Sequence, residues 1–290
     1  MLSDGRPSIY QLWRISLDKI YIPTLGRHDN QITYNALPDK WKKLVIMVVQ
    51  KKEEHLYEYD CEYLVVDNDI GIAKTRDIIH RHGGISKYFV VDDDLIFVRR
   101  NAKYYGGASN MEMSKRDFID NDYDEMIESI DEKLDGNVVL VGPRLAFLPP
   151  AQERYWDTGG GQYNAYALNG EVFSKLYEEI DWSWVDDTTI VCEDILLNLE
   201  ILSRGYKIGK FDEFLYNTKF GSDGGCSTFR TDNSILTGMN IVKEKFKDYV
   251  TVLSEEHKQG QPKVRIQWKK LYMDSEWKRP PEVSPLKEFF

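Results

Sequence analysis

The sequence has little cysteine and no long apolar run. Cys61, Cys192 and Cys226 are the only cysteines among its 290 residues, too few and too scattered for a disulfide framework or a thiolate zinc site. Apolar runs such as Leu44–Val49 fall far short of the ~20 residues that cross a bilayer, and residues 1–7 lack the apolar core of a signal peptide. We therefore expect a soluble protein of a reducing compartment, the cytoplasm.

Positive charge is also scarce. The 38 lysine and arginine residues are outnumbered by 48 aspartate and glutamate residues, which gives a formal net charge of −10. This balance excludes a uniformly basic nucleic-acid-binding protein, so any contact with nucleic acid must come from a local patch. Hydrophobic residues make up 42% of the chain, which is enough for a sizeable core and argues against global disorder.

The first hundred residues alternate between strand and helix patterns. Leu44–Val49 is a continuous apolar run with β-branched residues, which is typical of a strand buried on both faces. Strands and helices that alternate through short loops predict a parallel sheet with right-handed crossovers. The expected strands cover residues 19–25, 44–49, 62–66 and 88–91, and the expected helices cover residues 30–37, 51–59 and 72–82.

The rest of the chain has a less regular pattern. The terminal Arg279-Pro280-Pro281 favours an irregular end. We expect one large α/β domain over residues 1–250, followed by an irregular, basic and aromatic C-terminal extension over residues 251–290. The further expected elements are a helix at 114–134, strands at 138–141 and 164–168, and helices at 193–203 and 234–249.

Three consecutive carboxylates, Asp92-Asp93-Asp94, follow the apolar strand at residues 88–91. Charges at this position are costly unless a cation neutralises them, and ligands of open α/β sheets bind at the carboxyl ends of the strands. Oxygen ligands suit Mg²⁺ or Mn²⁺, which keep open positions for phosphate oxygens. The alternative interpretation is a solvated acidic turn or a helix N-cap.

Two loops after earlier strands carry residues suited to a nucleotide. In residues 22–27, proline and glycine would let the backbone approach a flat base, and Arg27 would contact a diphosphate. Asp67 and Asn68 follow the third strand, where they would hydrogen-bond a base or a ribose. The plainer alternatives are an ordinary strand end for the first loop and a helix start with Asp69 as N-cap for the second.

Two later features are weaker when taken alone. The pair Glu193-Asp194 opens an amphipathic helix, where carboxylates are common because they interact favourably with the helix dipole. Residues 222–227 form a glycine-rich segment that contains Asp223. This segment is suited to closing over a diphosphate, and its alternative interpretation is an ordinary loop.

In their order along the chain, these features resemble the GT-A class of nucleotide-sugar glycosyltransferases. Asp92-Asp93-Asp94 resembles the Asp-x-Asp metal motif of the class, and Cys192-Glu193-Asp194 resembles its x-Glu-Asp motif. The chain is similar, more narrowly, to the TET/JBP-associated glycosyltransferases, which are found largely in bacteriophages and are thought to glycosylate hydroxymethylated pyrimidines in DNA. The matching segments are Ile20–Gln31 followed by Ala36-Leu37-Pro38, Asp67-Asn68 leading into Gly71–Arg76, and Val91–Leu95.

The resemblance is best over residues 19–100 and extends to about residue 230. It implies a GT-A-like, Rossmann-type mixed sheet flanked by helices, with a nucleotide-sugar half at about 15–110 and an acceptor half at about 111–250. It also implies a UDP-sugar as donor and Mn²⁺ or Mg²⁺ as cofactor. The implied contacts to the nucleotide-sugar are Pro23, Thr24, Gly26, Arg27, Asp67, Asn68, Gly71, Arg76, Asp92 and Asp93.

The resemblance also implies roles for individual carboxylates. Asp94 would bind the divalent ion, and Asp92 would contact the ribose or a water on that ion. Asp223 is a candidate third metal ligand, although the class often has a histidine near that point. Asp194 would be the general base in an inverting reaction, with Glu193 as the second candidate, whereas a retaining enzyme of the same fold would not need this base.

The acceptor implied by the resemblance is 5-hydroxymethylcytosine or 5-hydroxymethyluracil in DNA, in the cytoplasm of the host cell if the protein is phage-encoded. Such a base must be flipped out of a duplex or presented on a single strand. Trp156, Tyr163, Trp182 and Trp184 would stack on it unless they belong to the core. The residues expected to contact the DNA backbone are Lys263, Arg265, Trp268, Lys269 and Lys270, with Arg99 and Arg100 next.

Other functions are also compatible with the sequence. The C-terminal basic stretch has a solvated tail as its plainer interpretation. A nucleotidyltransferase uses a similar sheet and acidic metal site, and a GT-A enzyme can act on a protein, a glycan or a small molecule instead of DNA. A catalytically silent DNA-binding module is the alternative that is not an enzyme.

Overall fold

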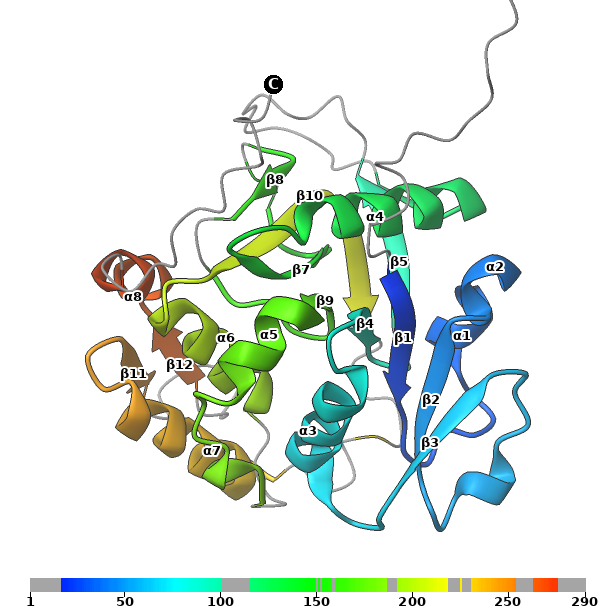
Figure 1. Cartoon of the computed structure of the whole chain (residues 1–290), viewed down its shortest axis with the longest axis horizontal. Coiled ribbons are helices and arrows are strands. Elements are labelled where there is room, and N and C mark those ends of the chain that lie inside the picture. Colours follow the sequence, from blue (N-terminus) through cyan, green and yellow to red (C-terminus); the bar gives the residue numbers. More distant parts are fainter. Residues whose placement is uncertain are drawn as a thin grey trace, which may run out of the picture.

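A large mixed β-sheet with helices on both faces forms the protein (Figure 1). The computed structural model describes residues 17–100, 115–149, 151, 153–157, 160–186, 192–218, 225, 231–253 and 263–275. Ten strands belong to the large sheet, in the order β3-β2-β1-β4-β9-β7-β10-β5-β6, with β8 paired to β10. They are β1 (Leu17–Pro23), β2 (Val45–Gln50), β3 (Glu62–Val66), β4 (Lys87–Val91), β5 (Leu95–Arg100), β6 (Lys115–Asp117), β7 (Val138–Leu145), β8 (Tyr155–Trp156), β9 (Ala165–Asn169) and β10 (Lys207–Thr218).

The first four strands are parallel to one another, as the strand–helix alternation predicts. Strand β1 pairs in parallel with both β2 and β4, and β2 pairs in parallel with β3. Every residue of β2 is buried, which confirms that both faces of this strand are covered. Strand β9 then runs antiparallel to β4 and to β7, so that the amino end of β9 lies beside the carboxyl end of β4.

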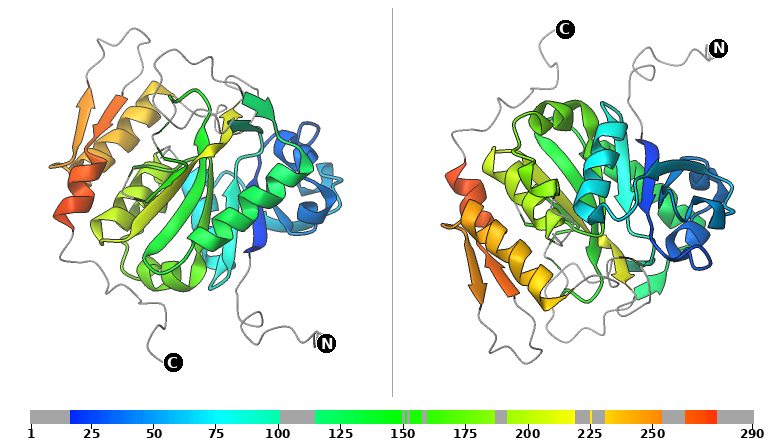
Figure 2. Two further views of the ribbon diagram at one scale, coloured as in Figure 1. Left: turned by 90° about the horizontal axis from the view of Figure 1, so that it is seen from above. Right: turned by 90° about the horizontal axis from the view of Figure 1, so that it is seen from below.

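Alternate residues of the central strands enter two separate cores. Tyr21 and Val48 face one core with helices α3, α5 and α6, whereas Ile22 and Val49 face the other with α1, α2 and α4. Figure 2 shows this two-sided cover from above and from below. The helices are α1 (Ile32–Ala36), α2 (Asp39–Lys42), α3 (Gly71–Gly83), α4 (Asp120–Lys133), α5 (Gly170–Tyr177), α6 (Glu193–Ser203), α7 (Asp232–Lys245) and α8 (Trp268–Asp274), with short 3₁₀ turns at Glu54–Leu56 and Ser183–Asp186.

Two of the expected helices are wrong in part, because backbone pairing between distant segments overrides the local pattern. Only Glu54–Leu56 is helical within residues 51–59, since the amide of Lys51 donates to the carbonyl of Val66 at 2.9 Å. Residues 115–117 are not the first turn of a helix but strand β6, which pairs antiparallel with the end of β5. No helix within the described ranges has the length and apolarity that a membrane crossing requires.

The C-terminal extension is not irregular over its described part. Strands β11 (Val250–Leu253) and β12 (Lys263–Ile266) form an antiparallel hairpin, and α8 packs against α6. Leu271 and Tyr272 of α8 are buried in the same core as α3, α5 and α6. The described residues after 250 are therefore continuous with the large domain rather than an appendage to it.

Buried His80 predicts a loss of stability in mild acid. Burial, and secondarily the charge of Arg76, lowers the pKa of His80 to about 3, whereas a histidine of the unfolded chain has a pKa near 6.5. Below that value the unfolded state binds a proton that the folded state does not, so the free energy of unfolding falls as the pH falls. We expect His80 to account for a loss of roughly 1–2 kcal/mol between pH 6.5 and pH 5.

Denaturant unfolding at the two pH values measures this loss. The His80→Gln variant should show a weaker pH dependence than the wild-type protein, whatever its absolute stability. The same substitution at exposed His55 is the matched control. Equal pH dependence in the wild-type protein and the His80→Gln variant would contradict the prediction.

Candidate active site

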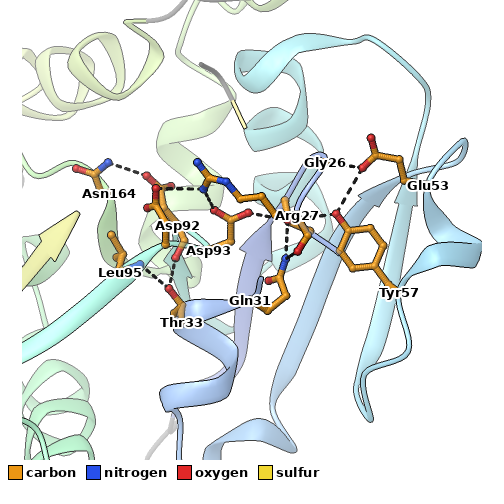
Figure 3. A network of polar contacts seen from close by, with 12 residues as sticks. Gly26, Arg27, Gln31, Thr33, Glu53, Tyr57, Asp92, Asp93, Leu95 and Asn164 are labelled. Atoms are coloured by element: carbon orange, nitrogen blue, oxygen red, sulfur yellow. Dashed lines mark hydrogen bonds and ion pairs between the residues drawn. The ribbon is translucent and has the colours of Figure 1, made fainter. Parts of the chain in front are cut away.

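The turn Asp92–Asp94 joins β4 to β5 at the carboxyl edge of the parallel strands, and Thr33 of α1 holds its backbone (Figure 3). The amide of Thr33 donates to the carbonyl of Asp93 at 3.0 Å, and its hydroxyl donates to the carbonyl of Asp92 at 2.6 Å. The same hydroxyl accepts the amide of Leu95 at 2.8 Å. Three bonds from one threonine fix the path of the chain through the acidic triplet.

Asp93 points inward. One of its carboxylate oxygens accepts the hydroxyl of Thr24 at 2.6 Å, and the other is paired with the guanidinium of Arg27. Asp93 is 4% exposed, and burial raises its pKa to about 6 against the opposing effects of Thr24 and Arg27. Asp93 therefore offers little surface to a nucleotide-sugar in this structure, because its two oxygens hold the first loop against the turn.

Arg27 links Asp93 to Asp94. Its Nη1 lies 3.1 Å from Oδ2 of Asp94, and the side-chain amide of Gln31 donates to the Arg27 carbonyl at 3.0 Å. The backbone amide of Gly225 donates to the carbonyl of Leu25 at 2.8 Å. A Cβ at position 225 would lie 3.3 Å from Nη2 of Arg27, so the chain at Gly225 approaches the first loop closely.

Asp92 connects two other parts of the sheet edge. Its Oδ2 accepts the side-chain amide of Asn164 at 2.6 Å, and its Oδ1 accepts Nη2 of Arg76 at 3.0 Å. The other terminal nitrogen of Arg76 donates to Oε1 of Glu193 at 2.6 Å. Asp92 of the metal motif and Glu193 of the acidic pair are thus joined through one guanidinium.

The acidic pair lies in the first turn of α6 with unequal access to solvent. Glu193 is buried, and burial raises its pKa to about 7 although Arg76 opposes the shift. Asp194 is only partly buried, and its Oδ1 accepts the amide of Ile195 at 2.7 Å. A cavity of about 10 Å³, the size of one water, lies beside the pair and is lined by Ala73, Arg76, Asp77, His80, Tyr166, Trp182, Trp184, Glu193, Asp194 and Leu197.

The residues expected to hold the nucleotide divide into a buried and an exposed set. Pro23 and Thr24 are buried beneath the loop, whereas Gly26, Asp67 and Asn68 are exposed at the same edge. Gly71, with a φ of 73°, begins helix α3 directly after this exposed set. The exposed set is therefore accessible to a ligand. Pro23 and Thr24 are buried and support the loop that follows β1.

The alternative in which Asp69 caps helix α3 is wrong. The helix begins at Gly71 after Ile70 in helical conformation, and Asp69 adopts a left-handed φ of 57°. The Asn68 side chain instead accepts the amide of Lys52 at 2.8 Å. The loop after β3 is thereby tied to the loop after β2.

Arg99 and Arg100, both expected to contact DNA, are paired with acidic side chains of the protein. Arg100 is 2% exposed and paired with buried Asp212 at 3.2 Å. Arg99 lies within ion-pair distance of Asp122, Glu125 and Glu213. Phosphate contacts require exposed cations, so the expectation for buried Arg100 is wrong, whereas the expectation for Arg99, whose side chain is 19% exposed, stays a prediction.

The C-terminal residues expected to contact DNA are more exposed to solvent. Arg265, Lys269 and Lys270 are exposed, and the ammonium of Lys270 lies 5.3 Å from the ring centre of Tyr249. Trp268 is half-buried and packs against the core. Lys263 lies in β12, but its side chain is outside what the structure describes.

The four aromatic residues considered for base stacking divide into two that pack in the core and two that do not. Trp184 is 7% exposed, and Trp182 stacks on Tyr177 with ring centres 4.4 Å apart. Arg144 lies 5.2 Å from the ring of Trp156. Trp182 and Trp184 therefore belong to the core, as the alternative interpretation holds, whereas Trp156 and Tyr163 are partly exposed and lie outside the described core clusters.

The carboxylates at the turn fit a hard divalent cation. The described residues contain no group of three or more histidine, cysteine, aspartate or glutamate side chains that could hold a metal ion, and Asp223 lies outside them. Mg²⁺, however, is usually bound through one or two carboxylates together with phosphate oxygens. Asp94 and Asp92, at the carboxyl edge of the parallel strands, supply two such carboxylates.

Several residues of this site were missed by the sequence analysis. Thr33 and Asn164 hold the acidic turn, Gln31 bonds the first loop at Thr24 and Arg27, and Glu53 accepts the amide of Gly26 at 2.7 Å. Tyr57 donates to the same carboxylate at 3.4 Å. Asn164 opens the strand expected at residues 164–168, but nothing in the sequence places that strand beside β4.

Comparisons with known proteins identify the family and the fold of the chain. Residues 18–225, more than two thirds of the chain, match the family described as TET-Associated Glycosyltransferase. No curated protein matches the sequence. A solved structure described as "GalNAc-T7 with UDP, GalNAc and Mn2+" is similar over 82% of this chain at 11% identity and a TM-score of 0.50, and the chain spans 50% of that protein's length.

That likeness shows the GT-A fold. An inositol-1-phosphate CTP transferase from T. maritima aligns over 79% of this chain and 97% of its own, at 14% identity. Its TM-score is 0.36.

Proposed function

Because the chain belongs to the TET-associated glycosyltransferase family, we propose that it transfers a sugar from a UDP-sugar to the hydroxymethyl group of 5-hydroxymethylcytosine or 5-hydroxymethyluracil in DNA. The observation that carries the proposal is the acidic turn, with Asp92 and Asp94 at the carboxyl edge of a GT-A sheet. The cytoplasm, that of the host cell if the protein is phage-encoded, is the compartment that fits this activity.

The donor is proposed to lie across the loops at this edge. Gly26, Asp67 and Asn68 are exposed there and would contact the base and the ribose. Arg27 is paired with Asp93 and Asp94 and its side chain is 9% exposed, so its charge would act on the diphosphate from beside Asp94 rather than by direct contact. The solved GT-A structure holds UDP and Mn²⁺, which supports the same ligand classes here.

Asp94 and Asp92 would hold Mn²⁺ or Mg²⁺, with Asp223 as a further candidate ligand. When bound, such an ion acts as a Lewis acid that stabilises negative charge on a departing diphosphate. The protein's own part is to place two carboxylates at a fixed turn, which Thr33 secures through three hydrogen bonds.

Asp194 is the proposed general base. The acceptor hydroxyl oxygen would form a bond to the anomeric carbon of the sugar as the bond from that carbon to the UDP oxygen breaks. The hydroxyl proton would pass to Asp194, which is more exposed than Glu193. This assignment makes the reaction inverting.

A donor and acceptor screen tests the proposed function. UDP-glucose, UDP-galactose, UDP-N-acetylglucosamine and UDP-arabinose are incubated with the protein and with DNA that contains 5-hydroxymethylcytosine or 5-hydroxymethyluracil. Mass spectrometry of the digested nucleosides should show an added sugar that depends on the hydroxymethyl group. Release of UDP without modified nucleosides would indicate another acceptor, and DNA binding without UDP release would indicate a binding module.

Helix α8 provides a separate prediction for DNA binding. Deleting the extension would remove Leu271 and Tyr272 from the core, so substitutions of exposed residues are the cleaner test. The double variant Lys269→Ala, Lys270→Ala should reduce the slope of log affinity against log salt by about 1–2, because each lost phosphate contact is worth ~0.9 on duplex DNA.

Affinity for UDP should stay unchanged in this double variant. The matched control is Lys175→Ala, which removes an exposed lysine of α5. A salt slope equal to that of the wild-type protein would exclude α8 from contact with the DNA backbone.

A further inference from the structure

Arg76 joins two parts of the site that lie far apart in the chain. It extends from the second turn of α3, and its two terminal nitrogens bind different carboxylates, Asp92 at 3.0 Å and Glu193 at 2.6 Å. Arg76 and Glu193 are 117 residues apart in sequence. Asp92 and Asn164 are bonded in turn, through both the side chain and the backbone.

This arginine has little surface to offer to a ligand. Its side chain is 7% exposed, and its guanidinium lies 5.8 Å from the ring centre of Tyr166, which is itself buried. A direct contact between Arg76 and the nucleotide-sugar, as the family resemblance implies, would require it to leave one of its two carboxylates. Leaving a buried charge unpaired is costly.

We propose that Arg76 is a positioning residue that sets the metal-motif carboxylate Asp92 against the acidic pair, and that Glu193 is its anchor rather than the base. The inference rests on the proposed function and deepens it. Helix α6 carries Glu193 and Asp194 in consecutive positions, so holding Glu193 fixes the turn that presents Asp194. The Arg76 side chain then fixes the distance between Asp92, on the donor side of the site, and the acidic pair, on the acceptor side.

The shape of the guanidinium suits this role. Its planar fork directs two N–H donors toward separate acceptors, whereas an ammonium is a compact point charge. In the Arg76→Lys variant one carboxylate can be paired, but two carboxylates on separate elements cannot be held in a fixed geometry. We therefore expect Arg76→Lys to retain less than about a tenth of the wild-type kcat, in the 10–100-fold range typical of residues that orient ligands of a site.

Four variants of the full chain test the proposal: Arg76→Lys, Arg76→Gln, Glu193→Gln and the double variant Arg76→Gln, Glu193→Gln. Glu193→Gln keeps an acceptor for Arg76 and should lower kcat by less than about tenfold, whereas loss of a general base costs about 10²–10⁴-fold. The double variant should be no slower than Arg76→Gln alone, because two residues that act through one contact are not additive.

Binding of UDP separates positioning from donor contact. For Arg76→Lys we expect the Kd for UDP to change by less than about threefold while kcat falls. A loss of UDP affinity as large as the loss of kcat/KM would overturn the proposal and make Arg76 a donor ligand. A loss of more than a hundredfold in Glu193→Gln would overturn the assignment of Glu193 as an anchor.

The matched control is Arg81→Gln, an exposed arginine on the same helix that pairs with Asp77, and it should leave kcat and UDP affinity unchanged. The thermal midpoints of the four variants provide a readout that needs neither metal nor substrate. Coupling between positions 76 and 193 in these midpoints supports the contact, and simple additivity contradicts it. If the wild-type protein transfers no sugar to any DNA, the proposed function fails, while UDP affinity and the midpoints still decide the role of Arg76.

Discussion

Replacing Asp94 with alanine is expected to lower the rate of sugar transfer by more than about a hundredfold and to leave the fold intact. Loss of a residue that only orients a metal ligand costs 10–100-fold, so loss of a proposed ligand should cost more. The fold should persist because Arg27, an ion-pair partner of Asp94 in this turn, keeps its ion pair with Asp93. Steady-state rates and a thermal melt of the variant measure the two effects separately.

Two controls make the Asp94→Ala result specific. Glu132→Ala removes an exposed carboxylate of α4 and should change neither rate nor melting temperature. A chelator should abolish wild-type turnover and have no further effect on the small residual rate of Asp94→Ala. Wild-type rates in Asp94→Ala would remove this carboxylate, and with it the proposed metal site, from the mechanism.

The second large effect is expected for Asp194→Asn. If Asp194 accepts the proton of the acceptor hydroxyl, the amide should lower kcat by about 10²–10⁴-fold, the range measured for general bases. Affinity for UDP should stay near the wild-type value, because Asp194 lies on α6 rather than in the loops that follow β1 and β3. Single-turnover transfer and UDP titration separate these quantities.

Glu193→Gln is the neighbouring comparison for this prediction. The two variants differ by one position on the same helical turn, yet Glu193 is paired with Arg76 and Asp194 is partly exposed. We expect Asp194→Asn to be far slower than Glu193→Gln. The reverse order would transfer the role of base to Glu193, and an undiminished rate in both variants would indicate a reaction without a protein base.

Much of the fold could be predicted because its signals are local. Strand β3 and helix α6 have the bounds that their apolar patterns predict, and the parallel order of the first strands follows from their alternation with helices. The failures depend on partners far away in the chain. Strand β6 exists because it pairs with β5, and the β11–β12 hairpin forms between segments on either side of residues 254–262.

In the candidate site, too, local features could be predicted from the sequence and contacts between distant residues could not. The place of the acidic turn follows from the apolar strand before it, but the direction of each aspartate does not. Asp93 turns inward because Thr24 and Arg27 reach it from a loop more than sixty residues earlier. In the sequence, Arg100 resembles a surface cation. The structure shows that it pairs with buried Asp212 on β10. Local pattern identifies which segments meet at the edge, and only the packed structure shows which charges pair there.

The most direct test of the account is a crystal structure of the protein with MnCl₂ and UDP. The anomalous signal of manganese should lie within coordinating distance of the Asp94 carboxylate, with the diphosphate of UDP on its other side and the base against the loops after β1 and β3. A manganese peak and a UDP molecule bound together at some other part of the chain, away from residues 92–94, would contradict it.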